Sequence, residues 1–96
     1  MATYVVLINW TDQGVKHAKD TVQRAQAFRS DMERLGGKVT GLYWTQGRYD
    51  LIATLEVPDE LTAMAGALAV SGLGNVHTET LRAYNDVEMT SILQRL

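Results

Sequence analysis

The segment between residues 43 and 50 restricts the fold of this chain most, because it places a tight-turn glycine between two strand-like runs. Gly47 has no Cβ and can adopt the positive φ that tight turns need. The run before it, Lys38–Thr45, and the run after it, Asp50–Val57, carry the apolar and β-branched residues typical of strands. The segment therefore predicts a β-hairpin that turns at residues 46–48.

More strands and helices are predicted on both sides of this hairpin. The run Tyr4–Ile8 is short, rich in β-branched residues and apolar throughout, which is typical of a strand buried on both faces. Thr11 can cap a short helical segment that runs to about Lys19. Thr21 can cap a longer helix, and the Gly36-Gly37 pair predicts where that helix ends.

After the hairpin, the chain predicts one more helix and one more strand. Pro58 cannot continue the strand ladder, and Asp59 can cap a helix from about Glu60 to Val70. The apolar residues of that helix form a stripe that is poor in charge: Leu61, Met64, Ala65, Leu68 and Ala69. A breaker cluster at 71–75 then leads into a fourth strand, Val76–Tyr84.

The order strand, helix, strand, strand, helix, strand is that of the split βαβ, or ferredoxin-like, pattern. The predicted fold class is therefore α+β: a ferredoxin-like βαββαβ domain over residues 1–96, with a four-stranded antiparallel sheet and both helices on one face. Asn85, with Glu88 three residues later, resembles a capping box. It predicts an extra C-terminal helix over about residues 86–95.

Both sides of the predicted sheet are apolar, although the helices cover only one of them. Strand 4–8 has no hydrophilic side, and simple alternation places Leu42 and Trp44 opposite Val39 and Tyr43. In the strand after the hairpin, alternation places Ile52 opposite Leu51, Ala53 and Leu55. An uncovered sheet face of this kind would exceed the few hundred Å² of apolar surface that monomers tolerate. We therefore expect a second copy to cover it, which gives a dimeric α/β barrel in a homodimer or a higher homo-oligomer.

Charge and cysteine content narrow the range of functions. Nine Lys/Arg against eleven Asp/Glu give a formal charge of −2, so no basic surface is expected for nucleic acid or a membrane. The absence of cysteine excludes disulfides and thiolate metal sites, and no motif indicates a metal site or a cofactor. With no signal-peptide pattern and no run of roughly 18 apolar residues, a cytoplasmic protein is expected.

Three stretches of the chain together resemble the GYD domain family. They are the opening segment Asn9–Gly14, the glycine and Tyr-Asp pair within Gly47–Asp50, and the late segment Gly74–Ala83. The resemblance covers residues 3–84 and stops at about residue 85. Because members of that family are small proteins without an established activity, the resemblance implies a ferredoxin-like fold and a dimeric α/β barrel rather than a function.

Two groups of residues could carry chemistry. His77 and Glu79 alternate onto one side of the fourth strand, where they can form an acid/base or metal-ligand pair if that side lines a cavity. An ordinary polar cross-strand pair is the alternative. The other histidine, His17, lies close to Lys16 and Lys19, which favours a solvated surface position.

The second group contains Asn9 and several aromatic residues. Small barrels of similar architecture include cofactor-independent monooxygenases and haem-degrading enzymes, in which an asparagine, a tryptophan and a histidine near the cavity matter. Asn9, Trp44 and His77 resemble these in type and strand placement, so they are the candidate catalytic residues. Alternatively, Trp44 and Tyr43 are large packing residues and Asn9 is a turn or cap residue.

The Tyr-Asp pair after the turn also allows two interpretations. The Asp50 carboxylate can accept backbone N–H bonds or pair with an arginine, which would fix the hairpin structurally. Alternatively, the hairpin tip is a ligand site in which Arg48 meets an anion.

Two functional hypotheses remain. The first is a homodimeric small-ligand-binding or regulatory domain. The second, supported by fold analogy alone, is a cofactor-independent monooxygenase or related small enzyme acting on an aromatic substrate in the barrel cavity. The candidate ligand-binding residues are Trp10, Tyr43, Trp44, Tyr49, Asp50, His77 and Glu79.

Overall fold

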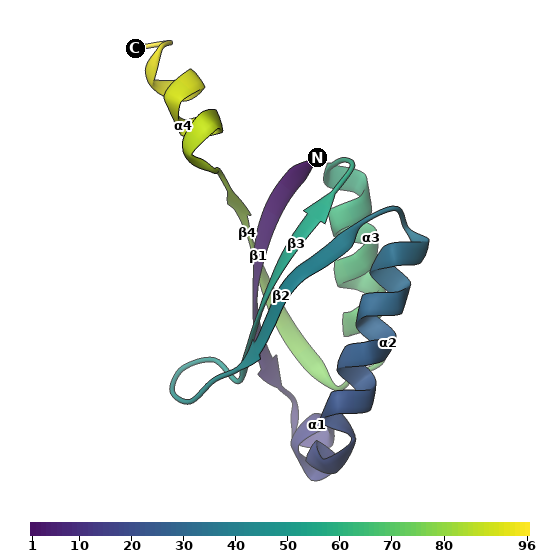
Figure 1. Ribbon diagram of the computed structural model, residues 1–96. Coiled ribbons are helices and arrows are strands. Elements are labelled where there is room, and N and C mark those ends of the chain that lie inside the picture. Colours follow the sequence, from purple (N-terminus) through teal and green to yellow (C-terminus); the bar gives the residue numbers. More distant parts are fainter.

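The computed structural model describes residues 1–96 as one four-stranded sheet with helices on one face (Figure 1). The strands are β1 (Ala2–Trp10), β2 (Lys38–Trp44), β3 (Leu51–Val57) and β4 (Val76–Ala83). Their spatial order is β2-β3-β1-β4, and each neighbouring pair is antiparallel. Helices α2 (Thr21–Arg34) and α3 (Glu60–Ser71) lie side by side on the same face. This is the predicted α+β ferredoxin-like fold.

The covered face of the sheet carries the hydrophobic core. In β3, every second residue is buried, so Leu51, Ala53, Leu55 and Val57 face the helices. The helices contribute Met32 and Ala63, and β1 contributes Tyr4, Val6 and Ile8. The predicted alternation in β3, with Ile52 on the other side, is confirmed.

A close contact between the two helices sets their spacing. Met32 of α2 is fully buried, and its sulfur lies against Gly66 of α3. A Cβ added at Gly66 would stand 2.7 Å from that sulfur. Because α3 presents only small residues at this point, it can lie close to α2 and to the sheet.

A β-bulge in β2 changes which of its residues face the helices. The register with β3 shifts after Val39, where Thr40 is left without a partner. As a result, Val39 and Leu42 both lie opposite buried residues of β3 and both pack against the core. Simple alternation put these two residues on opposite sides of the sheet. That expectation was wrong, because the extra residue reverses the alternation.

The β2–β3 hairpin turns through a loop at residues 45–50. Gly47 has φ of 107° there, as the prediction of a positive φ required. No other group lies within 4 Å of the position that its Cβ would occupy. The backbone angle, and not crowding, therefore explains glycine at this position.

The helical segment after β1 is broken into two parts. Thr11 caps α1 (Asp12–Lys16) as predicted, and a 3-10 turn, η1 (Ala18–Asp20), follows. The prediction that Thr21 caps the long helix was wrong, because Thr21 is its first residue. The Thr21 hydroxyl instead accepts a hydrogen bond from the indole N–H of Trp44, at 3.0 Å.

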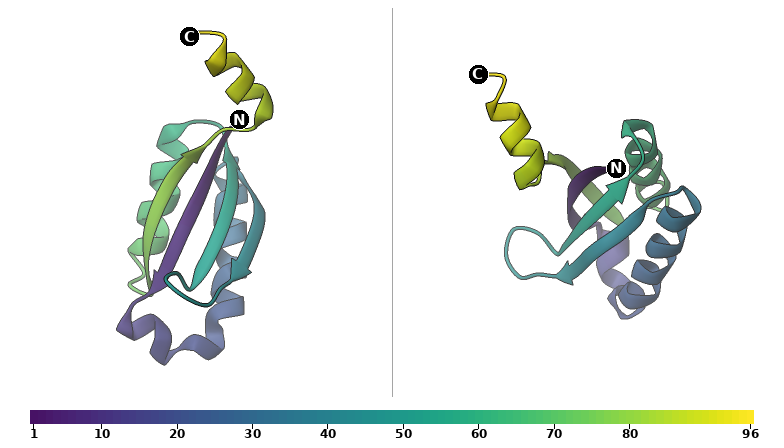
Figure 2. Two further views of the ribbon diagram at one scale, coloured as in Figure 1. Left: turned by 90° about the vertical axis from the view of Figure 1, so that its left-hand side faces the viewer. Right: turned by 45° about the horizontal axis from the view of Figure 1, so that its top comes forward.

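The last two helices begin at the predicted caps. Asp59 accepts the Thr62 amide and starts α3, and Asn85 and Glu88 form a complete capping box at the start of α4 (Asp86–Leu93). Figures 1 and 2 show α4 standing beyond the end of the sheet, away from α2 and α3. No helix is long and apolar enough to span a lipid bilayer.

Candidate functional site

The face of the sheet without helices is the first candidate site. Its central strands carry Val5, Leu7 and Ile52, and Leu7 lies directly opposite Ile52. On the outer strands, Leu81 pairs with Val5, and Tyr43 pairs with Ile52. Tyr43 is 68% exposed and Leu81 is 44% exposed, and no helix covers this face in Figure 1. These five side chains form an apolar patch from edge to edge, called here the bare-face patch.

A group of polar side chains lies at one end of the same face. Asn9 of β1 is directly opposite His77 of β4, and Glu79 is opposite Leu7, so all three share the bare face. The Tyr49 hydroxyl donates a hydrogen bond to Glu79 Oε2 at 3.0 Å. The predicted placement of His77 and Glu79 on one side of the strand is thus confirmed. Asn9, Tyr49, His77 and Glu79 are called the polar cluster below.

The polar cluster does not have the composition of a metal centre. Nowhere in the chain do three or more His, Asp or Glu side chains come close enough to hold a metal ion. The cluster offers an amide, an imidazole, a phenol and a carboxylate, which together can donate and accept hydrogen bonds. Its chemistry therefore suits recognition of a polar ligand group.

Asp50 holds the hairpin loop against β1. Its Oδ2 accepts the Trp10 amide at 2.9 Å, and its own amide donates to the Ile8 carbonyl at 2.9 Å. The Asp50 carbonyl also accepts the Thr45 amide at 2.8 Å across the base of the loop. No arginine lies within ion-pair distance of this carboxylate. These contacts correspond to the structural interpretation of the Tyr-Asp pair.

The three candidate catalytic residues do not meet in one chain. Asn9 and His77 pair on the bare face. Trp44 lies opposite the buried Leu51, on the covered face, and its indole is hydrogen-bonded to α2. The sheet therefore separates Trp44 from the other two, and the arrangement that the monooxygenase hypothesis requires is absent from the single chain.

The remaining predicted site residues are also spread out. Trp10 packs against the core on the covered face. Tyr43 is on β2, three strand positions from Glu79 on β4, which corresponds to roughly 14 Å at the usual strand spacing. His17 is exposed, as expected. Of the predicted site residues, only Asn9, Tyr49, His77 and Glu79 gather in one place.

The outer side of α3 is a second uncovered apolar surface. The stripe noted in the sequence turns outward, with Leu61 80%, Met64 58% and Leu68 62% exposed. Leu73 beyond the helix adds a fourth side chain that is 64% exposed. These four residues are called the α3 stripe. The sequence contains its signal, since no Asp, Glu, Lys or Arg occurs between Glu60 and Glu79.

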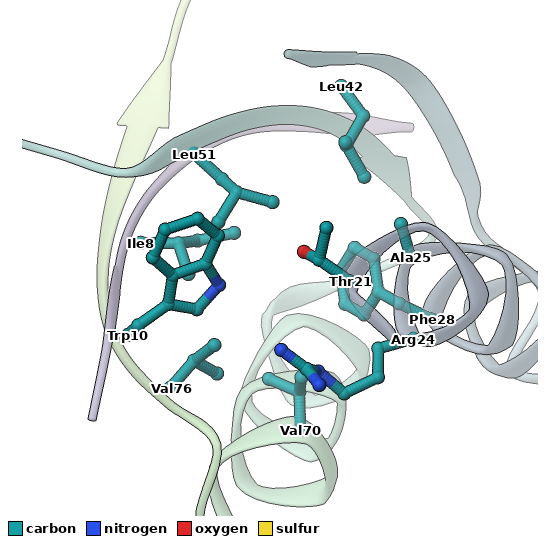
Figure 3. A pocket seen from close by; sticks show the side chains of 10 residues that line it. All are labelled: Ile8, Trp10, Thr21, Arg24, Ala25, Phe28, Leu42, Leu51, Val70 and Val76. Carbon is teal, nitrogen blue, oxygen red and sulfur yellow. The ribbon is translucent and has the colours of Figure 1, made fainter. Parts of the chain in front are cut away.

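Sequence reasoning also missed a small cavity on the covered side, near α1. Figure 3 shows Trp10 of β1 and Thr21, Arg24 and Phe28 of α2 around it, with Val70 of α3. Its volume is about 50 Å³, and most of its lining is apolar. No local sequence pattern predicts this cavity, because its walls come from strands and helices that are far apart in the sequence.

The fold and the bare face define a class: small ferredoxin-like α+β domains whose sheet is covered by helices on one side only. Within that class, the chain belongs to the GYD domain family, whose model matches residues 4–93. The match includes α4, so the expectation that the resemblance stops at about residue 85 was wrong. The sequence of α4 carries no glycine or Tyr-Asp pair by which the likeness could be seen.

Comparisons with individual proteins agree with this assignment. A Thermus thermophilus protein named glutamine synthetase and cystathionine beta-lyase binding protein is 29% identical over 97 residues, covering 100% of this chain and 99% of that protein. The crystal structure of TTHA0845 from the same organism is 28% identical, with a TM-score of 0.58 over 88% of this chain and 95% of that one. The crystal structure of FFRP-DM1 is 18% identical, with a TM-score of 0.57 over 88% of this chain and 100% of that one. At that identity, the second structure shows the fold alone.

Proposed function

We propose that this protein is a homodimeric small-ligand-binding or regulatory domain in which two copies pair through their bare sheet faces. The observation that carries the proposal is the bare-face patch, which no element of the chain covers. Two-fold pairing brings the same patch on both copies into contact, so an apolar surface is matched by itself. Burial of such surface is the main driving force for association.

The polar cluster supports a ligand role for the dimer interface. Asn9, Tyr49, His77 and Glu79 lie beside the apolar patch and on the same face. Pairing of the faces would enclose them between two apolar sheets, where hydrogen bonds to a ligand are stronger than in water. We infer a ligand with both hydrogen-bond donors and acceptors at this place.

A protein partner is the second part of the proposal. The α3 stripe lies on the helix side, so it stays exposed when the sheet faces pair. The Thermus relative is named for binding two enzymes, which supports an interaction role for the family. We infer that the α3 stripe is the surface offered to such a protein.

Sedimentation velocity at micromolar concentration tests the dimer. The expected mass is twice the 10.6 kDa of the chain. Ile52→Lys places a charge in the centre of the bare-face patch and is expected to give a folded monomer. Gln23→Lys, which adds the same charge on the exposed side of α2, is the matched control and should remain dimeric. A well-folded wild-type monomer at this concentration would refute the proposal.

A further inference from the structure

The small cavity on the covered side contains an arginine without an acidic partner. Arg24 is half-buried, and its guanidinium donates to the carbonyl of His17 at 2.7 Å and to that of Gly14 at 3.2 Å. The ion pairs of the protein involve Arg34 and Arg82 only. A guanidinium has five N–H donors, so several remain unused here. A half-buried positive charge of this kind is stabilised by an anion.

Two further donors surround the same space. The indole N–H of Trp10 makes no hydrogen bond within the protein, and the Thr21 hydroxyl accepts from Trp44 but donates to nothing. Figure 3 shows the indole nitrogen, the hydroxyl and the guanidinium directed toward the same space between the lining side chains. The polar groups at this site are therefore all available as donors, which fits an acceptor-only ligand group such as a carboxylate.

The rest of the cavity is apolar and small. Phe28, Val70 and Val76 form its walls, and they also line an adjoining cavity of about 100 Å³ that shares Arg24. Because Asp31 also lines that second cavity, it can take the apolar end of a ligand but not its negative end. The two cavities measure about 50 and 100 Å³, so only the apolar part of a small ligand fits inside them. A ligand must then place a short hydrocarbon tail inside and keep its negative end at the opening, beside Arg24.

We propose that this cavity binds a short-chain aliphatic carboxylate. The carboxylate accepts from Arg24, which suits bidentate pairing, and from the Trp10 indole and the Thr21 hydroxyl. The hydrocarbon tail lies against Phe28 and Val70. Because this site is on the side of the sheet opposite to the bare face, the inference goes beyond the proposed function and does not depend on the dimer.

Titration of the ¹⁵N-labelled full chain followed by NMR tests the proposal, with isovalerate, its alcohol analogue 3-methylbutan-1-ol, and inorganic phosphate as probes. Isovalerate is expected to give saturable shifts of the Trp10 indole N–H and, through the Thr21 hydroxyl, of the Trp44 indole N–H, with little change at the His77 amide of β4. Binding of the alcohol should be at least about tenfold weaker, since hydrogen bonds to a charged group exceed neutral ones by that order. Equal binding of the alcohol, or no saturable shift, would overturn the proposal; tighter binding of phosphate would replace it with a general anion site.

Two variants test separately the sites for the carboxylate and for the hydrocarbon tail of the ligand. Arg24→Gln should abolish isovalerate binding, while Arg29→Gln, which changes a charge on the same helix outside the cavity, should not. Because Arg24 also bonds the carbonyls near α1, a second variant is needed. Val70→Phe fills the space for the tail and keeps Arg24, and it should weaken isovalerate at least tenfold. Unchanged isovalerate binding in both Arg24→Gln and Val70→Phe would place the ligand elsewhere.

Discussion

The two faces of the sheet have similar apolar side chains but different surroundings. In β1, Tyr4, Val6 and Ile8 on the covered face are 6–8% exposed, whereas Val5 and Leu7 on the bare face stay partly exposed. The covered face gains its burial from α2 and α3, and no element of the chain does the same for the bare face. Hydrophobicity alone therefore does not define the core. The helices decide which apolar residues belong to it, and the others remain available for association.

The largest expected effect is on the free energy of unfolding, and it compares a residue of the covered face with one of the bare face. Leu55→Ala removes a side chain that is 4% exposed and should lower the free energy of unfolding by about 2–5 kcal/mol, from lost transfer energy and a cavity. Ile52→Ala, on the bare face, should cost less, and its cost should increase with protein concentration because it acts through the proposed dimer. Urea unfolding of both variants at two concentrations measures this. Equal, concentration-independent losses would contradict the distinction between the faces.

The tight packing on the covered face can be tested at Gly66. Gly66→Ala brings a Cβ within 2.7 Å of the Met32 sulfur and should destabilise the protein by about 1–3 kcal/mol through overpacking. In a Met32→Leu background, which removes that sulfur, the same change should cost less. Thermal unfolding of the four proteins in this cycle measures the coupling. Additive losses would show that this contact does not set the helix spacing.

Asp50 connects the hairpin loop to β1, the strand whose side chains alternate between the covered face and the bare face. Asp50→Ala leaves the part-buried Trp10 amide without its acceptor and should cost about 1–3 kcal/mol of folding free energy. Asp50→Asn keeps an acceptor oxygen and should cost less. Chemical unfolding gives both values, and amide hydrogen exchange at Trp10 should accelerate in the alanine variant. If Asp50→Ala leaves the free energy of unfolding unchanged, the structural interpretation of the Tyr-Asp pair is wrong.

The smallest expected effect concerns α4, which belongs to neither face. The Asn85 amide, and after it Arg82, hold the pKa of the Glu88 carboxyl below its ordinary value of 4.5. Because the folded pKa is lowered, this stabilisation is complete above pH 4.5 and is lost as pH falls through the lower value. Carbon chemical shifts of residues 86–93 should therefore report fraying of α4 in acid. Glu88→Gln should remove that pH dependence, and an unchanged titration would contradict the role of the capping box.

The elements that were predicted correctly have local signals. The caps at Asp59 and Asn85, the glycine at position 47 and the alternation in β3 each depend on residues within a few positions of one another. Local hydrogen bonds and backbone angles act over the same range. The order of elements, and with it the ferredoxin-like fold, could therefore be predicted.

The elements that were predicted wrongly depend on distant contacts. The bulge at Thr40 is a property of the β2–β3 pairing and reverses the side on which Val39 lies. The direction of the α3 stripe was not predicted, and it depends on the packing of the inner side of α3, where the buried Ala63 and Gly66 lie and Gly66 meets Met32. The candidate site was likewise predictable only in part, since Asn9 and His77 share a face but Trp44 does not.

The sequence by itself determined the elements, their order and the presence of more apolar surface than one layer of helices can cover. Only the tertiary structure decided where that surface lies, which polar residues accompany it and that Arg24 stands at an apolar cavity without an acidic partner. The physical reason is that hydrophobic attraction has no direction, so composition measures its amount. Strand register and helix packing involve residues far apart in the chain, and they determine where the uncovered apolar surface lies.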